Sequence, residues 1–458
     1  HIIRLFISGS DMDDMKNDKK YTIYMLIFLV ILLVPFAGML ITGASASESD
    51  LSAKLPSVRT GDGKLNIGYL KSAGDYFEGH CALRQEMVTI YSAVTAKIFK
   101  TSSQKSVICG KDGWMYYTDT LGDYTGSEGM SERQIFDAVR TLKLIDDYCK
   151  ENETELVLAI AANKNSLYGG NMPYYYAKTA APGNRILLTQ KLKEEGIKFV
   201  DLYDTFAAEG RVLYHKTDSH WNNEGAALAA HAIHSAAGTM HTDRFGSKAP
   251  YKIRKDFKGD LAAMMYPSAV PPEDEIYYDD GPSFKYVGKV GSNFDNKIKT
   301  TGTGTKNLLM YRDSFGSSLL PFMAEPYANA LFSRSLTVSV RDFESAKPDV
   351  FVIEKAERFL PQLFENPPKL PRREEAAQPE GVRELAGVKY EISSSNGYTT
   401  ITGTLAEGTY GTDTLIYVCV DGEHWYEAYP VYNGGKEGFA LYIEEIREQA
   451  RIKVYGAF

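Results

Sequence analysis

The sequence predicts an α/β fold: a parallel sheet with helices on both faces, preceded by an apolar N-terminal helix and followed by a small β-sandwich. Between about residues 66 and 365, short continuous apolar runs alternate with amphipathic stretches. This alternation is typical of strands buried on both faces and joined by helices. From residue 383 onward, six β-branched or alternating runs are separated by turn residues, which indicates a separate all-β module.

The apolar run at residues 21–43 contains no charged residue. About 20 such residues suffice to cross the hydrocarbon core of a membrane. Three lysines precede the run and two acidic residues follow it. The positive-inside rule then places residues 1–20 in the cytoplasm and the chain after about residue 45 outside, on a single-pass anchor in the cell membrane. The alternative is a signal peptide cleaved near Ala44-Ser45-Ala46, which would make the protein secreted.

Composition excludes several classes of protein. The net charge is −8 and the pI is about 5.6, and the basic patch of a nucleic-acid-binding protein is missing from the sequence. The four cysteines contain no C-x-x-C pair, which argues against a zinc ribbon or a thioredoxin motif. We therefore predict no cofactor, no metal and no nucleic-acid partner, and leave disulfide pairing open.

The predicted domains follow from these patterns. Residues 44–65 form a linker, 66–365 the α/β domain, 366–382 a Pro-rich linker and 383–458 the β-sandwich. Within the α/β domain, residues 240–304 interrupt the alternation and predict an insertion with hairpins. The predicted helices cover residues 131–153, 184–196 and 222–238, and the predicted strands cover 155–162, 198–204, 307–313, 329–335 and 349–355.

A serine follows the strand-like run in the stretch 307–321. The strand is expected to end at Tyr311 and a helix to begin near Ser317, with a tight turn at Ser314 between them. Ligand sites of open α/β sheets lie at the carboxyl ends of the strands, and free backbone N–H groups at a helix start can hold an oxyanion. Ser314 is therefore a candidate nucleophile that needs a base. The alternative is that Asp313 or Ser314 only caps the helix.

An acid and an imidazole lie two residues apart in the stretch 214–226. In extended backbone, Asp218 and His220 point to the same side. Asp218 can then orient the ring of His220, whose other nitrogen is free to act as a base near neutral pH. The alternatives are an Asx-turn with an exposed histidine, or a metal site formed with His215, for which the sequence offers no further strong ligand nearby.

The two motifs together resemble a known family. The D-x-H-W-N motif at residues 218–222 and the R-D-S-F-G motif at 312–316 look like those of the AlgJ/AlgX alginate O-acetyltransferase family, an SGNH-hydrolase-like group that includes the DHHW proteins. The resemblance covers roughly residues 66–365. Further segments similar to the family lie at residues 77–84, 110–117, 163–173, 257–261 and 354–358.

The resemblance implies a three-layer SGNH-like α/β/α domain with Ser314 as nucleophile, His220 as base and Asp218 as its orienter. It also implies O-acetylation of an exported or cell-surface polysaccharide through an acetyl-serine, with acetyl supplied by a membrane-bound O-acyltransferase. An oxyanion hole would be formed by the Ser314 N–H and a neighbour. A carbohydrate acetylesterase with the same triad and a non-catalytic polysaccharide-binding scaffold are the rival functions.

Weaker predictions concern residues around these motifs. Glu354 and Arg358, four residues apart, are expected to form a structural ion pair. Aromatic residues of the C-terminal module, such as Trp425 and Tyr429, could stack on sugars but are expected in the β-sandwich core. The residues predicted to touch substrate are Trp221, Tyr311, Arg312 and Lys164.

Overall fold

The computed structural model describes residues 19–42, 56–80, 82–239, 244–246, 248–447 and 449–458. The chain divides into two compact units. The first contains residues 1–104 and 262–271, and the second contains residues 105–261 and 272–458. Outside the described residues lie residues 1–18 of the predicted cytoplasmic tail (1–20), most of the 44–65 linker and the predicted cleavage site near residue 45.

Helices dominate the described part of the first unit. They are α2 (Lys19–Thr42), α3 (Tyr69–His80) and α4 (Arg84–Val94), which continues into a π-helical turn, η2 (Thr95–Phe99). α2 lies over the run expected as a membrane anchor. Within the residues that the structure describes, no helix has the length and hydropathy of a membrane span. The anchor therefore stays a prediction.

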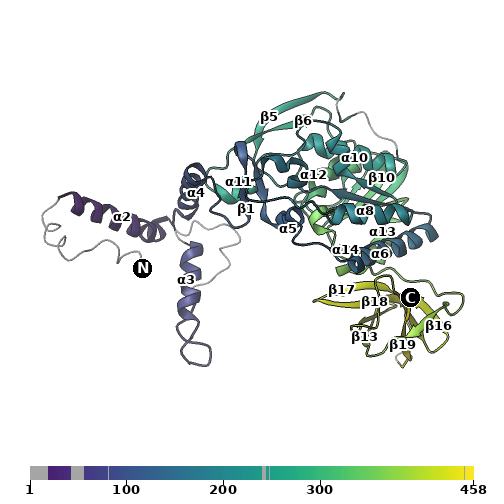
Figure 1. Cartoon of the computed structure of the whole chain (residues 1–458). Helices are drawn as coiled ribbons and strands as arrows, with labels where there is room; N and C mark the ends of the chain where they lie inside the picture. The colour runs from purple at the N-terminus through teal and green to yellow at the C-terminus, as the bar shows by residue number, and fades with distance from the viewer. Residues whose placement is uncertain (1–18, 43–55, 81, 240–243, 247, 448) are drawn as a thin grey trace. The chain divides into compact units, whose positions relative to one another are not determined.

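A seven-stranded sheet, of which β10 is labelled in Figure 1, forms the centre of the second unit. Its strand order is β4-β3-β11-β9-β10-β8-β7. Five neighbouring strands pair in parallel, whereas β8 pairs antiparallel with β10, and β7 pairs antiparallel with β8. The parallel strands are β3 (Glu155–Ala161), β4 (Phe199–Asp201), β9 (Lys306–Tyr311), β10 (Tyr327–Ser333) and β11 (Val350–Ala356), and the edge strands are β7 (Lys285–Tyr286) and β8 (Lys297–Thr301).

The mixed sheet corrects the expectation of a purely parallel one. Both antiparallel strands come from the segment expected as an insertion. Only residues 302–305 join β8 to β9, whereas a parallel crossover needs a dozen residues or more. The chain therefore turns back, and β8 pairs antiparallel with β10.

Helices cover both faces of the sheet, which gives the three layers expected. One face packs against α6 (Glu132–Glu151), α8 (Asn184–Glu194) and α13 (Val340–Ala346). The other face packs against α9 (Leu202–Ala207), α10 (Asn223–Ala236) and α12 (Phe315–Ala324). Alternate residues of β3 enter the two cores: Leu158 faces the first group of helices and Ala159 the second. Every side chain of the strand from residue 156 is buried, which explains its continuous apolar sequence.

Shorter elements surround the sheet. A hairpin is formed by β5 (Tyr251–Phe257) and β6 (Glu273–Tyr278), with α11 (Asp260–Met265) between its strands in the sequence. The others are β1 (Val107–Cys109), β2 (Met115–Tyr117), α5 (Leu121–Thr125), α7 (Lys164–Tyr168), α14 (Gln362–Glu365) and the 3-10 turns η3 (Lys111–Gly113), η4 (Thr118–Thr120), η5 (Gly169–Asn171) and η6 (Glu357–Phe359).

Two four-stranded antiparallel sheets form the C-terminal part and share one core. Trp425 and Tyr429 are buried but lie outside this shared core, which differs from the expectation. Trp425 packs with Tyr417 and Cys419, and Tyr429 packs in the core on the α6 side of the α/β sheet, so a role in stacking on sugars does not fit their positions. One sheet contains β12 (Val382–Glu384), β19 (Ile452–Ala457), β15 (Leu415–Val420) and β16 (His424–Glu427). The other contains β13 (Lys389–Ser395), β14 (Tyr398–Thr404), β18 (Lys436–Glu444) and β17 (Tyr429–Asn433).

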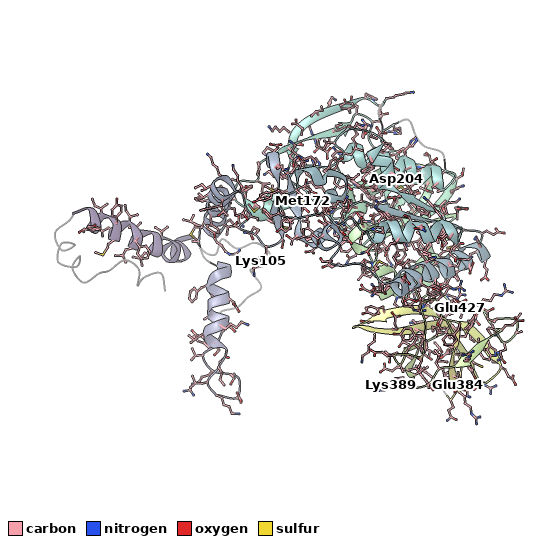
Figure 2. The ribbon with its side chains drawn as sticks, in the orientation of Figure 1. Lys105, Met172, Asp204, Glu384, Lys389 and Glu427 are labelled. Carbon is pink, nitrogen blue, oxygen red and sulfur yellow. The ribbon has the colours of Figure 1, made fainter. Side chains whose placement is uncertain are left out.

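The segment 366–382, expected as a linker, is packed against both parts of the second unit. Arg372 donates to the carbonyl oxygens of Leu144 in α6 and Glu427 in β16. Arg140 of α6 makes a two-pronged ion pair with the carboxylate of Glu427, the residue labelled on the sandwich in Figure 2. These contacts attach the sandwich to the helical face of the sheet that lies opposite α12.

Candidate active site

Ser314, His220 and Asp218 come together at the carboxyl end of β9. The loop before α10 carries the histidine and aspartate, and the turn between β9 and α12 carries the serine. The distance from His220 Nε2 to Ser314 Oγ is 2.8 Å, and that from His220 Nδ1 to Asp218 Oδ1 is also 2.8 Å. These distances suit a ring that donates its Nδ1–H to the carboxylate and accepts from the serine hydroxyl at Nε2.

The His220 side chain and two backbone N–H groups together keep the Asp218 carboxylate ionised. The N–H of His220 donates to Oδ1 at 2.8 Å, and the N–H of Asp260 donates to Oδ2 at 2.7 Å. Burial alone would raise the pKa of Asp218. The hydrogen bond and charge of His220, together with the two backbone N–H groups, outweigh burial and lower that pKa to about 2. Asp218 therefore carries a negative charge at any physiological pH.

Asp260 is a site residue that sequence reasoning did not single out, although it lies in the family-like segment 257–261. Its carboxylate accepts from Ser219 N at 2.8 Å and Ser219 Oγ at 2.5 Å, and it lies 3.7 Å from His220 Nδ1. Burial and the charge of Asp218 raise its pKa. Asp260 thus holds the loop between the two triad residues from one side.

The hairpin of β5 and β6 supports the same loop from another segment. The Glu273 carboxylate accepts from Lys216 N at 2.8 Å and from Thr217 N at 2.6 Å. Glu275 lies 2.9 Å from Nε2 of His215, whose ring stacks on Phe257. His215 is therefore engaged away from His220. In the described part of the chain, the group with metal-ligand spacing is Asp218, His220 and Asp260, whose atoms already make the bonds given above.

Lys164 lies buried beneath the loop that carries Asp218 and His220, and it is not exposed to a substrate. Only 3% of the residue is accessible. Its ammonium donates to the carbonyl oxygens of Met115 at 2.6 Å, Lys216 at 2.7 Å and Asp218 at 2.9 Å. Burial lowers the pKa of Lys164 to about 7, against the opposing effect of the Asp218 carboxylate. Lys164 was predicted to touch substrate, but all hydrogen bonds of its ammonium go to the protein backbone. Its position is therefore that of a buried support for the loop.

Lys164→Met is expected to destabilise the protein by roughly 2–5 kcal/mol, because it removes the three hydrogen bonds that this buried ammonium donates to backbone carbonyl oxygens. Thermal and urea unfolding of the full chain measure this change. Lys191→Met on the exposed side of α8 is the matched control and should have no effect comparable in size. Equal stability of the two variants would contradict the supporting role.

The nucleophile turn is fixed by Asp313 and not by Ser314. The Asp313 carboxylate accepts from Phe315 N at 2.8 Å and from Ala356 N at 2.7 Å, and Asp313 N donates to Glu354 at 3.0 Å. Ser314 makes no side-chain capping bond to α12, so its hydroxyl is available to His220. Asp313 therefore caps α12, and Ser314 is left as the candidate nucleophile.

The remaining three predicted substrate contacts lie beneath the site surface. Arg312 donates to Ser317 Oγ at 3.0 Å and to the Asn293 carbonyl at 2.8 Å. Tyr311 donates to Asp342 at 2.8 Å. Trp221 donates to Ser318 at 2.8 Å. All three side chains are buried, so the structure gives them supporting positions in place of the predicted contacts.

The three side chains form a hydrogen-bonded Ser–His–Asp set at the carboxyl edge of a three-layer α/β/α fold, and the aspartate and histidine precede the serine in the chain. These features define an SGNH-hydrolase-like protein. Residues 107–275 match the family described as "SGNH hydrolase-like domain, acetyltransferase AlgX". This match covers the part of the chain that contains Asp218 and His220, and it supports the resemblance to the AlgJ/AlgX family seen in the motifs.

Two curated relatives share the name "Probable alginate O-acetylase AlgJ". The protein from Pseudomonas syringae pv. tomato is 24% identical over 383 residues, covering 74% of this chain and 88% of that protein. The protein from Pseudomonas putida is 22% identical over 326 residues, covering 65% and 81%.

Solved structures with a similar fold include Bacillus cereus PatB1, at 16% identity and a TM-score of 0.43, covering 56% of this chain and 96% of that one. Another is the O-acetyltransferase domain of Pseudomonas putida AlgJ, at 18% identity and a TM-score of 0.37, covering 57% and 93%.

Proposed function

We propose that this protein O-acetylates a polysaccharide through an acetyl-serine intermediate on Ser314. The observation that carries the proposal is the hydrogen-bonded chain from Ser314 Oγ through His220 to Asp218, with 2.8 Å at each step. The nature of the acyl group and acceptor is supported by the two relatives named alginate O-acetylase and by the acetyltransferase family that the chain matches.

The geometry gives each group a role. His220 Nε2 takes the proton of Ser314 as Oγ attacks the acetyl carbonyl carbon, and then returns that proton to the departing donor. A sugar hydroxyl next attacks the acetyl-serine, gives its proton to His220, and leaves Ser314 free once the proton returns to Oγ. The Asp218 carboxylate keeps the ring oriented and stabilises the imidazolium in both halves.

A transferase passes the acetyl group from Ser314 to a sugar hydroxyl, whereas an acetylesterase passes it to water. Because the same triad can do both, the acceptor of the acetyl group distinguishes the two functions. The test incubates the purified full chain with a chromogenic acetyl ester, with and without uncharged and uronate-containing oligosaccharides. Acetylated oligosaccharide, detected by mass spectrometry, is the expected result. Release of acetate alone would favour the esterase, and saccharide binding without turnover would favour a scaffold. Either outcome contradicts the transferase.

We further propose that the catalytic domain lies outside the cytoplasm, tethered through the N-terminal segment, and receives acetyl from a membrane-bound O-acyltransferase. The uncharged run at 21–43 and the lysines before it support this proposal. Protease added to intact cells should digest the domain while leaving a cytoplasmic marker uncut. A domain that is protected until the cells are lysed would contradict this location.

A further inference from the structure

Arg358 presents a guanidinium that has aromatic neighbours but no hydrogen-bonding or ionic partner among the described residues. Among the described residues, no hydrogen bond or ion pair to Arg358 is present, and its Nε is buried with no acceptor. The expected ion pair with Glu354 is wrong. Spacing of four residues brings side chains together in a helix, but residues 350–356 form the strand β11. The carboxyl of Glu354 instead accepts from Asp313 N.

Glu354 is also unsuited to act as a counter-ion. The residue is fully buried. Burial, followed by the charge of Asp313, raises the pKa of Glu354 well above its usual value. This shift favours the uncharged form of the carboxyl, and Glu354 forms no ion pair with Arg358 among the described residues. The arginine is thus left with its donors free for a group that the protein does not supply.

The guanidinium lies beside the catalytic groups. It stacks on the ring of Phe315, the residue after the nucleophile, at 5.3 Å from guanidinium carbon to ring centroid. The same ring contacts the imidazole of His220, with 4.7 Å between centroids. Tyr117 and Phe359 lie 5.7 Å and 4.6 Å from the guanidinium carbon. The three rings surround the guanidinium of Arg358 through cation–π contacts, and its N–H groups remain available to donate hydrogen bonds.

The backbone immediately before Arg358 is fixed relative to Ser314. Ala356 N donates to the Asp313 carboxylate, which also holds the N–H of Phe315. The Glu357 carboxylate accepts from Asn163 N at 2.9 Å and Ser166 Oγ at 2.6 Å. A charged group on such a braced turn is preorganised, so little reorganisation is required during a reaction.

The reaction at Ser314 creates a negative oxygen that needs two donors. Attack of Oγ moves the π electrons of the acyl carbonyl onto its oxygen, and collapse of the tetrahedral intermediate restores the double bond and expels the leaving group. The Ser314 N–H, at the start of α12, can supply one donor. The next amide cannot supply the second, because Phe315 N already donates to Asp313 at 2.8 Å.

We propose that Arg358 is a catalytic residue that donates to the oxyanion formed at Ser314 during both acylation and deacylation. This inference rests on the proposed acyl-transfer function. A guanidinium can donate two parallel N–H groups to an oxygen anion and remains charged at every working pH. The donor pair would then combine the backbone of α12 with a side chain from the turn after β11.

The test measures the pre-steady-state burst of the full chain with p-nitrophenyl acetate, a neutral ester with no anionic acceptor present. The burst amplitude counts the folded active sites, and the burst rate reports the chemistry. Arg358→Met should lower the acylation rate constant roughly 10²–10³-fold with the amplitude kept. Arg358→Lys should retain part of the rate, and added guanidinium ion should partly rescue Arg358→Ala. Arg341→Met, on the exposed side of α13, is the matched control and should behave as wild type.

An unchanged burst rate in Arg358→Met would overturn the role. So would a defect seen only in transfer to a uronate-containing acceptor, since the arginine would then bind substrate carboxylates. A lower amplitude with a wild-type rate would show a purely structural residue. A wild-type protein that gives no burst contradicts the proposed function itself, so the two failures are distinguishable.

Discussion

Ser314→Ala should reduce the turnover of an acetyl ester by roughly 10⁴–10⁶-fold, because the substitution removes the oxygen that receives the acyl group. The fold should be unaffected. The side chain of Ser314 makes no capping bond to α12, and the turn is held by Asp313. Steady-state hydrolysis, intact-protein mass spectrometry and thermal unfolding of the same samples measure the three consequences.

The acetyl adduct is the sharper readout for this variant. Wild-type protein mixed with the ester and quenched within the burst should gain the mass of one acetyl group, located on the peptide that contains Ser314. The variant should gain none. Ser345→Ala, an exposed serine on α13, is the control and should retain both turnover and adduct. Residual turnover near the wild-type level in Ser314→Ala would rule out this serine as nucleophile.

Asp218→Asn is expected to cost about 10⁴-fold in turnover, the size of effect that follows loss of the orienting carboxylate in a triad. The two oxygens of Asp218 accept from His220 N, His220 Nδ1 and Asp260 N. An amide has only one accepting oxygen, so one of these N–H groups must face the new NH₂ group. The ring of His220 would then lose either its orientation or the tautomer that leaves Nε2 free.

The same substitution should leave a signature in stability against pH. A carboxylate whose pKa falls from about 4 in the unfolded chain to about 2 in the folded one stabilises the fold above pH 4. That contribution is lost as the pH falls through about 2. The stability gap between wild type and Asp218→Asn should therefore be full at neutral pH and narrow in strong acid. The exposed Asp413→Asn serves as control. A gap independent of pH would contradict the ionised state of Asp218.

Local patterns in the sequence were sufficient to predict the main architecture. Apolar runs at 155–162, 307–313 and 349–355 predicted strands that became β3, β9 and β11, because a strand covered on both faces must be apolar along its length. The same local signals indicated a nucleophile in a turn before a helix and an acid and base two residues apart. The spacing of these motifs, read as a resemblance, also indicated the family.

Tertiary packing decided which polar residues face a substrate. Lys164, Tyr311 and Arg312 follow or end strands, where sequence reasoning expects ligand contacts, yet they are buried. Their partners are carbonyl and carboxyl groups of distant segments, and no local pattern reports these. Arg358 is the opposite case. The sequence predicted an ion pair with Glu354 four residues earlier, but Glu354 lies in the strand β11, where this spacing does not bring the two side chains together.

The sequence by itself therefore determined the α/β class, the position of the nucleophile turn and the identity of the acid–base pair, because each depends on neighbours within a few residues. Only the folded chain decided that Asp260, at the start of α11, donates its N–H to Asp218 and that the N–H groups of Arg358 stand unpaired beside Phe315. Those relations join residues dozens of positions apart, and their energies arise from burial and hydrogen bonds that exist only once the layers have packed.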